Sequence, residues 1–169
     1  MAELLGLDMI GIELENSTSN ISQGNVILRM DKKYPIADYF PYLIVSDNIR
    51  TLDSKTDLIN IDPFQGKDTL KRKARAGLGI EISIAPARKL DAPLIAGWLK
   101  QLKSVYRFCK SADCQFILSS GATSINEMVS ARSFESILNI LGMTPRTYWK
   151  EISEWLFSKS KARWQNVKS

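Results

Sequence analysis

The chain has 169 residues, 44% of them apolar, and a formal net charge of +5. This length is enough for one domain with a hydrophobic core, and no apolar run reaches the 18 residues of a membrane span. The first residues lack the positive segment and the cleavage site of a signal peptide. We therefore expect a single cytoplasmic domain over residues 1–169, with no membrane partner.

Histidine is absent from the sequence. This excludes Ser-His and Cys-His nucleophile pairs, an imidazole base and any metal site that uses histidine. The two cysteines, Cys109 and Cys114, are too few for a disulfide scaffold. Each lies close to a phenylalanine in the sequence, so we expect buried, reduced thiols.

Short apolar runs that stand between turn-forming residues predict the strands. Some are almost continuously apolar, which is typical of parallel strands covered on both faces. Helical patterns alternate with these runs, and the alternation predicts a parallel α/β sheet or a (β/α) barrel. The predicted strands are Met9–Leu14, Val26–Met30, Tyr42–Ser46, Leu58–Asp62, Ile80–Ile84 and Gln115–Ser119.

Three helices are predicted before residue 143. The first covers Asp68–Ala76 and ends at Gly77, a favourable residue after a helix C-terminus. The second is a long helix with Asp91 as its N-cap and Pro93 in its first turn. The third contains Phe134 and stops at Gly142. We expect the second helix to bury an apolar stripe with helical spacing: Leu94, Ile95, Trp98, Leu99, Leu102, Val105, Tyr106 and Cys109.

A last helix is predicted from Thr144 and Pro145, as N-cap and first helical residue. Its expected inward residues are Tyr148, Trp149, Ile152, Trp155 and Leu156. Trp149 and Trp155 lie six residues apart, on nearly opposite faces. We expect Trp155 in the core, and Trp149 near a protein interface unless a loop covers it.

The charges are divided unevenly along the chain. Residues 1–66 contain 5 Lys/Arg and 10 Asp/Glu, whereas residues 67–169 contain 18 and 8. An acidic front and a basic back within one domain indicate a polyanionic partner on one side.

The basic half contains three patches. One is Lys67, Lys71, Arg72, Lys73 and Arg75, for which a solvated helix face is an equal alternative. The second, Lys100, Lys103, Arg107 and Lys110, follows steps of three and four along the long helix, with no acid inside that segment to pair with. The third is the tail, with Lys159, Lys161, Arg163 and Lys168 around Trp164. Together they favour a nucleic acid as partner.

The loops that follow the predicted strands carry hydroxyls and guanidinium groups but few acids. Ser119, Ser120, Arg88 and Arg132 are candidates for a joint anion-binding or assembly surface, because these groups suit phosphate. The alternative for the two serines is that they satisfy backbone groups in their own turn. Asp8, Asp47 and Asp62 stand near strand ends and are candidate Mg²⁺ ligands, although turn or capping roles are the more common ones.

The ordered set of motifs over residues 42–158 resembles the family of protein component 3 of ribonuclease P. The resemblance is strongest in three features: the strand Ile117–Leu118 with its Ser119–Ala122 turn, Arg132 about ten residues later, and the apolar helix that ends with Leu141-Gly142-Met143. Upstream, Tyr42–Ser46, Leu58–Pro63 and Gly79–Ile84 are similar to successive strands of that family's barrel.

This resemblance implies a (β/α) barrel of the polymerase-and-histidinol-phosphatase type that serves RNA binding and assembly rather than catalysis. We expect the family's first strand to be missing and Ala2–Gly6 to correspond to the end of the helix after it. The expected barrel is therefore short or incomplete at its N-terminus. The implied function is a subunit of ribonuclease P, the endoribonuclease that removes the 5′ leader of precursor tRNA. The implied partners are the ribonuclease P RNA, which holds the catalytic Mg²⁺, other protein subunits including a small ferredoxin-like one, and, indirectly, precursor tRNA.

The expected RNA-binding residues are Lys67, Lys71, Arg72, Arg75, Arg88, Lys100, Lys103, Arg107, Lys110, Ser119, Ser120 and Arg132. No catalytic residue, metal ligand or cofactor is expected in the chain itself. Two alternatives stay open: a metal-dependent phosphoesterase of the same barrel superfamily that works through carboxylates, and a catalytically silent barrel that binds only proteins.

Overall fold

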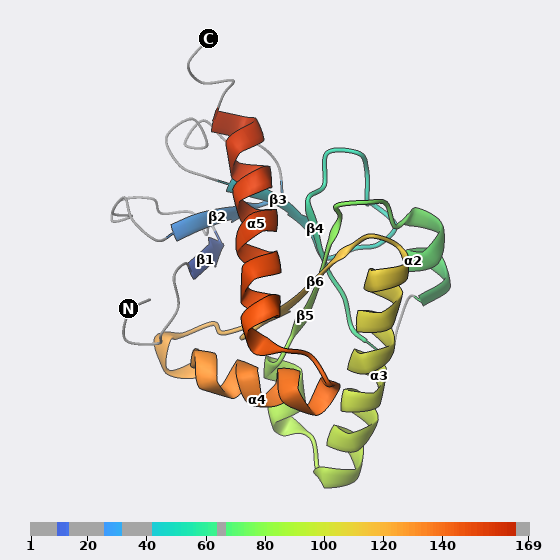
Figure 1. The fold of residues 1–169 in the computed structure, drawn as a ribbon, viewed down its shortest axis with the longest axis vertical. Helices are drawn as coiled ribbons and strands as arrows, with labels where there is room; N and C mark the ends of the chain where they lie inside the picture. The colour runs from blue at the N-terminus through green and yellow to red at the C-terminus, as the bar shows by residue number, and fades with distance from the viewer. Residues whose placement is uncertain (1–9, 14–25, 32–41, 64–66, 165–169) are drawn as a thin grey trace.

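The computed structural model describes residues 10–13, 26–31, 42–63 and 67–164 (Figure 1). These form an α/β fold of strands and helices in alternation. In chain order the elements are β1 Ile10–Glu13, β2 Val26–Met30, β3 Tyr42–Ser46, β4 Leu58–Asn60, α2 Lys67–Lys73, β5 Gly79–Ser83, η2 Ala85–Lys89, α3 Ala92–Ser111, β6 Gln115–Ser119, η3 Ile125–Glu127, α4 Ala131–Leu141 and α5 Pro145–Trp164.

All six strands are parallel and lie in the sheet in their chain order, β1-β2-β3-β4-β5-β6. The predicted parallel α/β class is therefore confirmed. The predicted strand bounds are confirmed for β2, β3 and β6, and β4 and β5 differ from prediction by one or two residues. The predicted ends of β1, Met9 and Leu14, lie outside the described residues. Among the described strands β1 pairs with β2 and β6 with β5, and no pairing joins β1 to β6.

One face of the sheet packs on α3 and α4. In-register residues of neighbouring strands lie on the same face, so the pairs Ile59↔Ile80 and Ile80↔Phe116 place these three side chains in one row. All three are buried. They belong to a core cluster that also contains Trp98, Leu102, Val105 and Cys109 of α3, and Phe134, Leu138 and Leu141 of α4. Burial of this apolar area is the main favourable contribution to folding.

The start of α3 is formed as predicted. The Asp91 carboxylate accepts the backbone N–H of Leu94 at 3.1 Å, and a proline lies in the first turn. The predicted burial of Leu94 and Ile95 was wrong, because these side chains are 55% and 38% exposed. All of residues 92–96 are exposed, since none of the described elements covers the first turn of α3. The helical spacing gives the correct face but cannot show where the neighbouring elements end.

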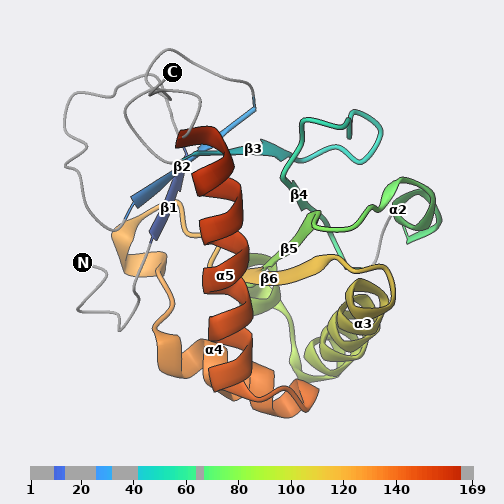
Figure 2. The same cartoon turned by 45° about the horizontal axis from the view of Figure 1, so that its top comes forward.

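The other face of the sheet carries α5. Trp155 is buried against Ile27, Leu43 and Leu58 of three neighbouring strands, and its indole N–H donates to the Gly77 carbonyl at 2.9 Å. Gly79 lies under this ring: a Cβ there would stand 2.8 Å from the indole. In Figure 2 the strands follow one another around α5, and α3 lies on the far side of the sheet. The predicted core position of Trp155 is confirmed.

The first half of α5 covers the free edge of β6. The Leu118 N–H points away from β5 and donates to the Tyr148 hydroxyl at 2.8 Å. On the same edge the Phe116 carbonyl accepts the side-chain amide of Gln115 at 3.1 Å. Side chains thus satisfy two backbone groups that a further strand would otherwise pair with.

The C-terminal ends of α2 and α4 were both predicted from a glycine in the sequence. Gly142 and Gly77 both adopt positive φ, at 76° and 73°, and α4 stops as predicted before Gly142. The helix α2 ends at Lys73, three residues before the predicted end, and a turn closed by the Leu78 N–H on the Arg75 carbonyl follows it. The remnant helix expected at Ala2–Gly6 lies outside the described residues.

Candidate nucleic-acid interface

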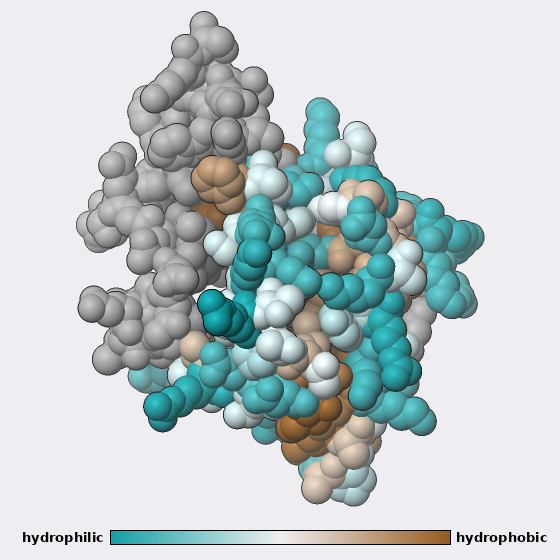
Figure 3. Space-filling model, in the orientation of Figure 1, coloured by the Kyte–Doolittle hydropathy of each residue, from teal (hydrophilic) through white to brown (hydrophobic). Residues whose placement is uncertain are grey.

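The face of α3 opposite its buried residues carries a row of cations, Lys100, Lys103 and Arg107. Lys100 and Arg107 are exposed and Lys103 is half-buried. Among the described residues, no hydrogen bond or ion pair is formed by any of the three side chains. Figure 3 shows hydrophilic side chains gathered over the middle of α3. This row, hereafter the α3 cation row, therefore presents three unneutralised positive charges to solvent.

Lys110, the fourth member of the predicted row, is in a different situation. Its ammonium lies 2.9 Å from a carboxylate oxygen of Glu151 on α5, and 6.0 Å from the centre of the Tyr106 ring. The hydrogen bond to Glu151 raises the pKa of Lys110. The sequence contains no acid near Lys110 in α3, but the fold supplies one from a helix 41 residues away. Lys110 is therefore neutralised and does not extend the α3 cation row.

The basic patch around α2 divides into free and engaged residues. Lys71 and Arg72 are exposed, and Arg72 makes one long contact, 3.5 Å, with the Thr69 hydroxyl. The Lys73 ammonium donates to the Arg50 carbonyl at 2.5 Å.

Arg75, the last member of this patch, donates to the carbonyls of Ser54 and Thr56. The guanidinium of Arg75 thus stabilises the connection between β3 and β4. Arg75 therefore has a structural role that does not require RNA. Lys67 is in α2, and Lys161, Arg163 and Trp164 are in α5. The structure does not describe the side chains of these four residues. Lys168 lies outside the described residues.

The Ser119 and Ser120 hydroxyls are used within the fold. Ser119 Oγ lies 3.3 Å from Ser83 Oγ, which accepts the side-chain amide of Asn60 at 3.2 Å. Ser120 Oγ accepts the N–H of Ala122 at 3.2 Å. The Ser120 contact is the backbone role given as the alternative from the sequence, whereas Ser119 contacts a side chain of the neighbouring strand β5.

Among the described residues, neither Arg88 nor Arg132 forms a hydrogen bond with Ser119 or Ser120. Arg88 donates to the Glu127 carbonyl and so links η2 to the loop after β6. Glu127 is further fixed by the Thr123 hydroxyl, and this hydrogen bond lowers the pKa of its carboxyl group. Arg132 is exposed in the first turn of α4, and its guanidinium forms no hydrogen bond or ion pair within the described part of the chain.

A buried ion pair lies on the face of the sheet that carries α5. Arg29 of β2 and Glu81 of β5 contact each other through two hydrogen bonds of 2.5 Å, although β3 and β4 lie between them. The Glu81 side chain is 1% exposed. Side chains of this length can meet across two strands only if the sheet curves toward them, since neighbouring strands are spaced by about 4.8 Å. This face is therefore concave.

A carboxylate phosphoesterase would need Asp8, Asp47 and Asp62 to converge on one metal site. Asp47 and Asp62 are exposed, and Asp8 lies outside the described residues. Asp47 lines a hollow of about 330 Å³ at the end of β3, together with Asp31 and Asp53. In the described ranges of the chain, no three Asp, Glu or Cys side chains are arranged so that they could hold a metal ion.

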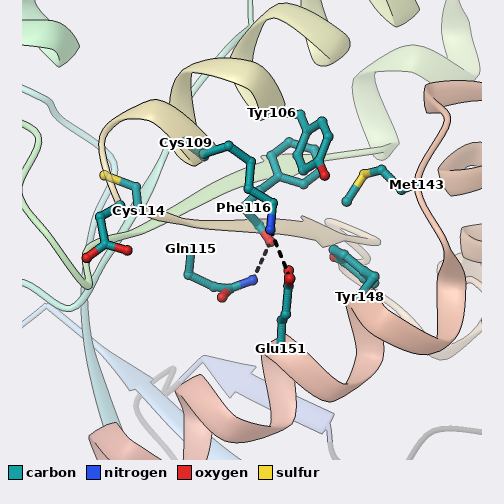
Figure 4. A pocket seen from close by; sticks show the side chains of 10 residues that line it. Tyr106, Cys109, Cys114, Gln115, Phe116, Met143, Tyr148 and Glu151 are labelled. Atoms are coloured by element: carbon teal, nitrogen blue, oxygen red, sulfur yellow. Dashed lines mark hydrogen bonds and ion pairs between the residues drawn. The ribbon is translucent and has the colours of Figure 1, made fainter.

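A second hollow, of about 220 Å³, was not predicted from the sequence. It lies where the last turns of α3, the free edge of β6 and the first half of α5 meet, and Figure 4 shows its side chains. Its lining residues are Tyr106, Cys109, Lys110, Asp113, Cys114, Gln115, Phe116, Met143, Tyr148 and Glu151. The only signal in the sequence was an aromatic residue, Tyr106, among the cations of α3.

The comparisons with known proteins add no relative. No protein-family model matches the chain, and no curated protein is significantly similar to it. Among the helices that the structure describes, none combines the length and apolar character required to cross a membrane.

Proposed function

We propose that this chain is a protein subunit of ribonuclease P that binds RNA and supports assembly, and that does not cleave precursor tRNA by itself. The observation that carries the proposal is the α3 cation row. Three cations on one helix face, with no carboxylate to neutralise them within the described residues, are an electrostatic footprint for a phosphate backbone. The motif order from the strand Gln115–Ser119 to Gly142 supports the particular family.

The fold supports the same proposal. Parallel strands in chain order around a concave face are what a barrel of the polymerase-and-histidinol-phosphatase type contains, and we propose that the described strands are part of such a barrel, incomplete at its N-terminus. That barrel type cleaves phosphoesters in enzymes whose metal ligands include histidines. This sequence contains no histidine, which favours a scaffold that now grips RNA.

The partners follow from the family. In this proposal the ribonuclease P RNA holds the Mg²⁺ that cleaves the 5′ leader, a small ferredoxin-like protein subunit joins the complex, and the setting is cytoplasmic. In this complex the chain contributes positively charged side chains and a surface against which the RNA packs. Phosphate contacts of this kind set affinity and orientation and carry no base identity.

The test is affinity purification of the tagged chain from the cells that encode it. The expected result is a large structured RNA in the eluate, with Mg²⁺-dependent 5′ cleavage of precursor tRNA that nuclease treatment of the RNA abolishes. The RNA-free chain should not cleave precursor tRNA. Hydrolysis of a generic phosphodiester by the RNA-free chain with Mn²⁺ would favour the phosphoesterase alternative, and an eluate with protein partners but no RNA would favour a protein-binding barrel.

A further inference from the structure

The hollow between α3, β6 and α5 has one aromatic wall. The rings of Tyr106 and Phe116 meet edge to face at a centroid distance of 5.6 Å, and Phe116 meets Tyr148 in the same way at 6.5 Å. Phe116 and Tyr148 are buried, whereas Tyr106 is half-buried. Tyr106 is thus the ring that is available to a flat ligand from outside.

Three side chains of the hollow, Gln115, Asp113 and Glu151, offer acceptor oxygens, and Lys110 adds one ammonium group. The Gln115 amide nitrogen is committed to the Phe116 carbonyl, which leaves the amide oxygen as an acceptor. Asp113 is exposed, and Glu151 is half-buried and paired with Lys110 at 2.9 Å. Carboxylates repel a phosphate, so this site does not suit the backbone of a nucleic acid. Amide and carboxylate oxygens do suit the amino groups of a base.

The hollow adjoins the α3 cation row. Tyr106 follows Lys103 by three residues and precedes Lys110 by four, so these side chains are neighbours on the helix surface. At its volume of about 220 Å³ the hollow is smaller than the roughly 300–1,000 Å³ typical of sites for drug-sized ligands. It therefore suits a single ring system rather than a peptide or a larger cofactor.

We propose that this hollow binds one unpaired nucleobase that carries an exocyclic amine, in a strand whose phosphates lie along the α3 cation row. This inference rests on the proposed RNA binding. The base stacks on Tyr106, and its amine donates to the oxygens of Gln115 and Asp113. Proteins read single-stranded RNA in this way, with splayed bases stacked on aromatic side chains and hydrogen-bonded at their edges.

Cys114 provides a direct test, because it lines the hollow and is half-buried, whereas Cys109, which also lines the hollow, is buried and should react only if the fold opens. The full chain is incubated with a thiol-alkylating reagent alone, with a short oligoadenylate, or with a matched strand that contains abasic sites and has the same number of phosphates. Alkylation of each cysteine is followed by mass spectrometry. We expect oligoadenylate to slow alkylation of Cys114 several-fold, and the abasic strand to leave it unchanged at equal occupancy.

The binding affinities should separate the contribution of the stacked base from that of the phosphates. The abasic strand should bind about 5- to 150-fold more weakly than oligoadenylate, which is the range for loss of one stacked base. Oligouridylate, which has no exocyclic amine, should fall between them. Tyr106→Leu should reduce binding of oligoadenylate to that of the abasic strand and leave binding of the abasic strand unchanged. Gln115→Ala should remove the preference for adenine over uracil. Because Gln115 is half-buried, this variant tests the site without removing a core side chain.

Equal affinity for oligoadenylate and the abasic strand, with Cys114 alkylated at the same rate in both complexes, would overturn the base site and leave the α3 cation row intact. Failure of all strands to bind at low salt would overturn the proposed RNA binding and, with it, the base site.

Discussion

The Glu81 carboxylate and the Arg29 guanidinium contact each other through two hydrogen bonds of 2.5 Å across the width of two intervening strands. Glu81 is 1% exposed and Arg29 is 14% exposed. The pair fixes the curvature of the sheet in one geometry, since the two groups separate if the sheet flattens. The pair places two opposite charges together at a mostly buried site, where an isolated charge is strongly unfavourable.

Glu81→Gln is expected to destabilise the protein by about 3 kcal/mol, because it removes the carboxylate that pairs with the Arg29 guanidinium through two hydrogen bonds at a mostly buried site. The double variant Arg29→Met with Glu81→Leu should recover most of this loss, since replacing a whole buried pair with apolar side chains is often neutral. Urea denaturation of the wild type and both variants measures the differences.

The exposed pair Lys150–Glu154 is the matched control for that prediction. Its atoms are 3.8 Å apart and its side chains are 75% and 66% exposed, so Glu154→Gln should change the free energy of unfolding by less than about 0.5 kcal/mol. A similar small effect of Glu81→Gln would mean that water screens the Arg29–Glu81 pair and that it does not hold the sheet.

Two glycines should respond in opposite directions to alanine. A Cβ at Gly79 would stand 2.7 Å from Leu58 Cδ1 and 2.8 Å from the Trp155 indole, so Gly79→Ala should cost about 1–3 kcal/mol through overpacking. A Cβ at Gly97, within α3, would meet nothing within 4 Å. Gly97→Ala should therefore raise stability by about 0.5–1 kcal/mol, because alanine favours the helix. Thermal melting of both variants tests the packing of α5 on the sheet, and a neutral Gly79→Ala would contradict it.

Stability should decline at alkaline pH. Burial raises the pKa of the thiols of Cys109 and Cys114 above the ordinary 9.0, and that of the Tyr148 phenol above the ordinary 10.0. In the unfolded chain these groups lose their protons near the ordinary values, whereas in the folded chain they keep them. The stabilisation is therefore complete below about pH 9 and is lost as the pH rises above it.

The midpoint of urea unfolding, measured from pH 7 to pH 10.5, is the readout for the alkaline decline. The variant Cys114→Ala, which removes one half-buried thiol, should show a shallower decline than the wild type. A midpoint that stays constant across this range would mean that the three groups ionise as readily in the folded protein as in the unfolded chain.

Local signals in the sequence predicted much of the fold. The strands β2, β3 and β6 were predicted to the residue, because short apolar runs between turn residues are a local property. The cap at Asp91 and the stop at Gly142 are likewise set by neighbours in the chain. The exposure of Leu94 was not predictable in this way, because it depends on where neighbouring elements end.

The candidate site was less predictable, because its contacts join distant parts of the chain. Glu151 neutralises Lys110 from 41 residues away, and Arg29 meets Glu81 over 52 residues. No periodicity relates such positions. The hollow beside Tyr106 arises only when α5 packs along the edge of β6, and an aromatic residue between lysines was its only trace in the sequence.

The α3 cation row gives the sharpest prediction. Reversing its charges with Lys100→Glu, Lys103→Glu and Arg107→Glu should leave the fold intact, because these side chains form no hydrogen bond or ion pair with other described residues. RNA affinity should fall strongly, and the slope of log affinity against log salt should become shallower by roughly one unit for each phosphate that the protein no longer neutralises. Filter binding at several salt concentrations measures both quantities.

A control with the same change in net charge separates direct phosphate binding from general attraction. Lys89, Arg146 and Lys150 are exposed cations outside the row, and their joint replacement by glutamate changes the charge by the same amount. This control should weaken RNA binding only modestly, because a charge beyond about 10 Å from the phosphates is largely screened at 0.1 M salt. If both triple variants show the same decrease in affinity and the same change in slope, the RNA does not lie along α3, and Lys71 and Arg72 of α2 become the residues to reverse next.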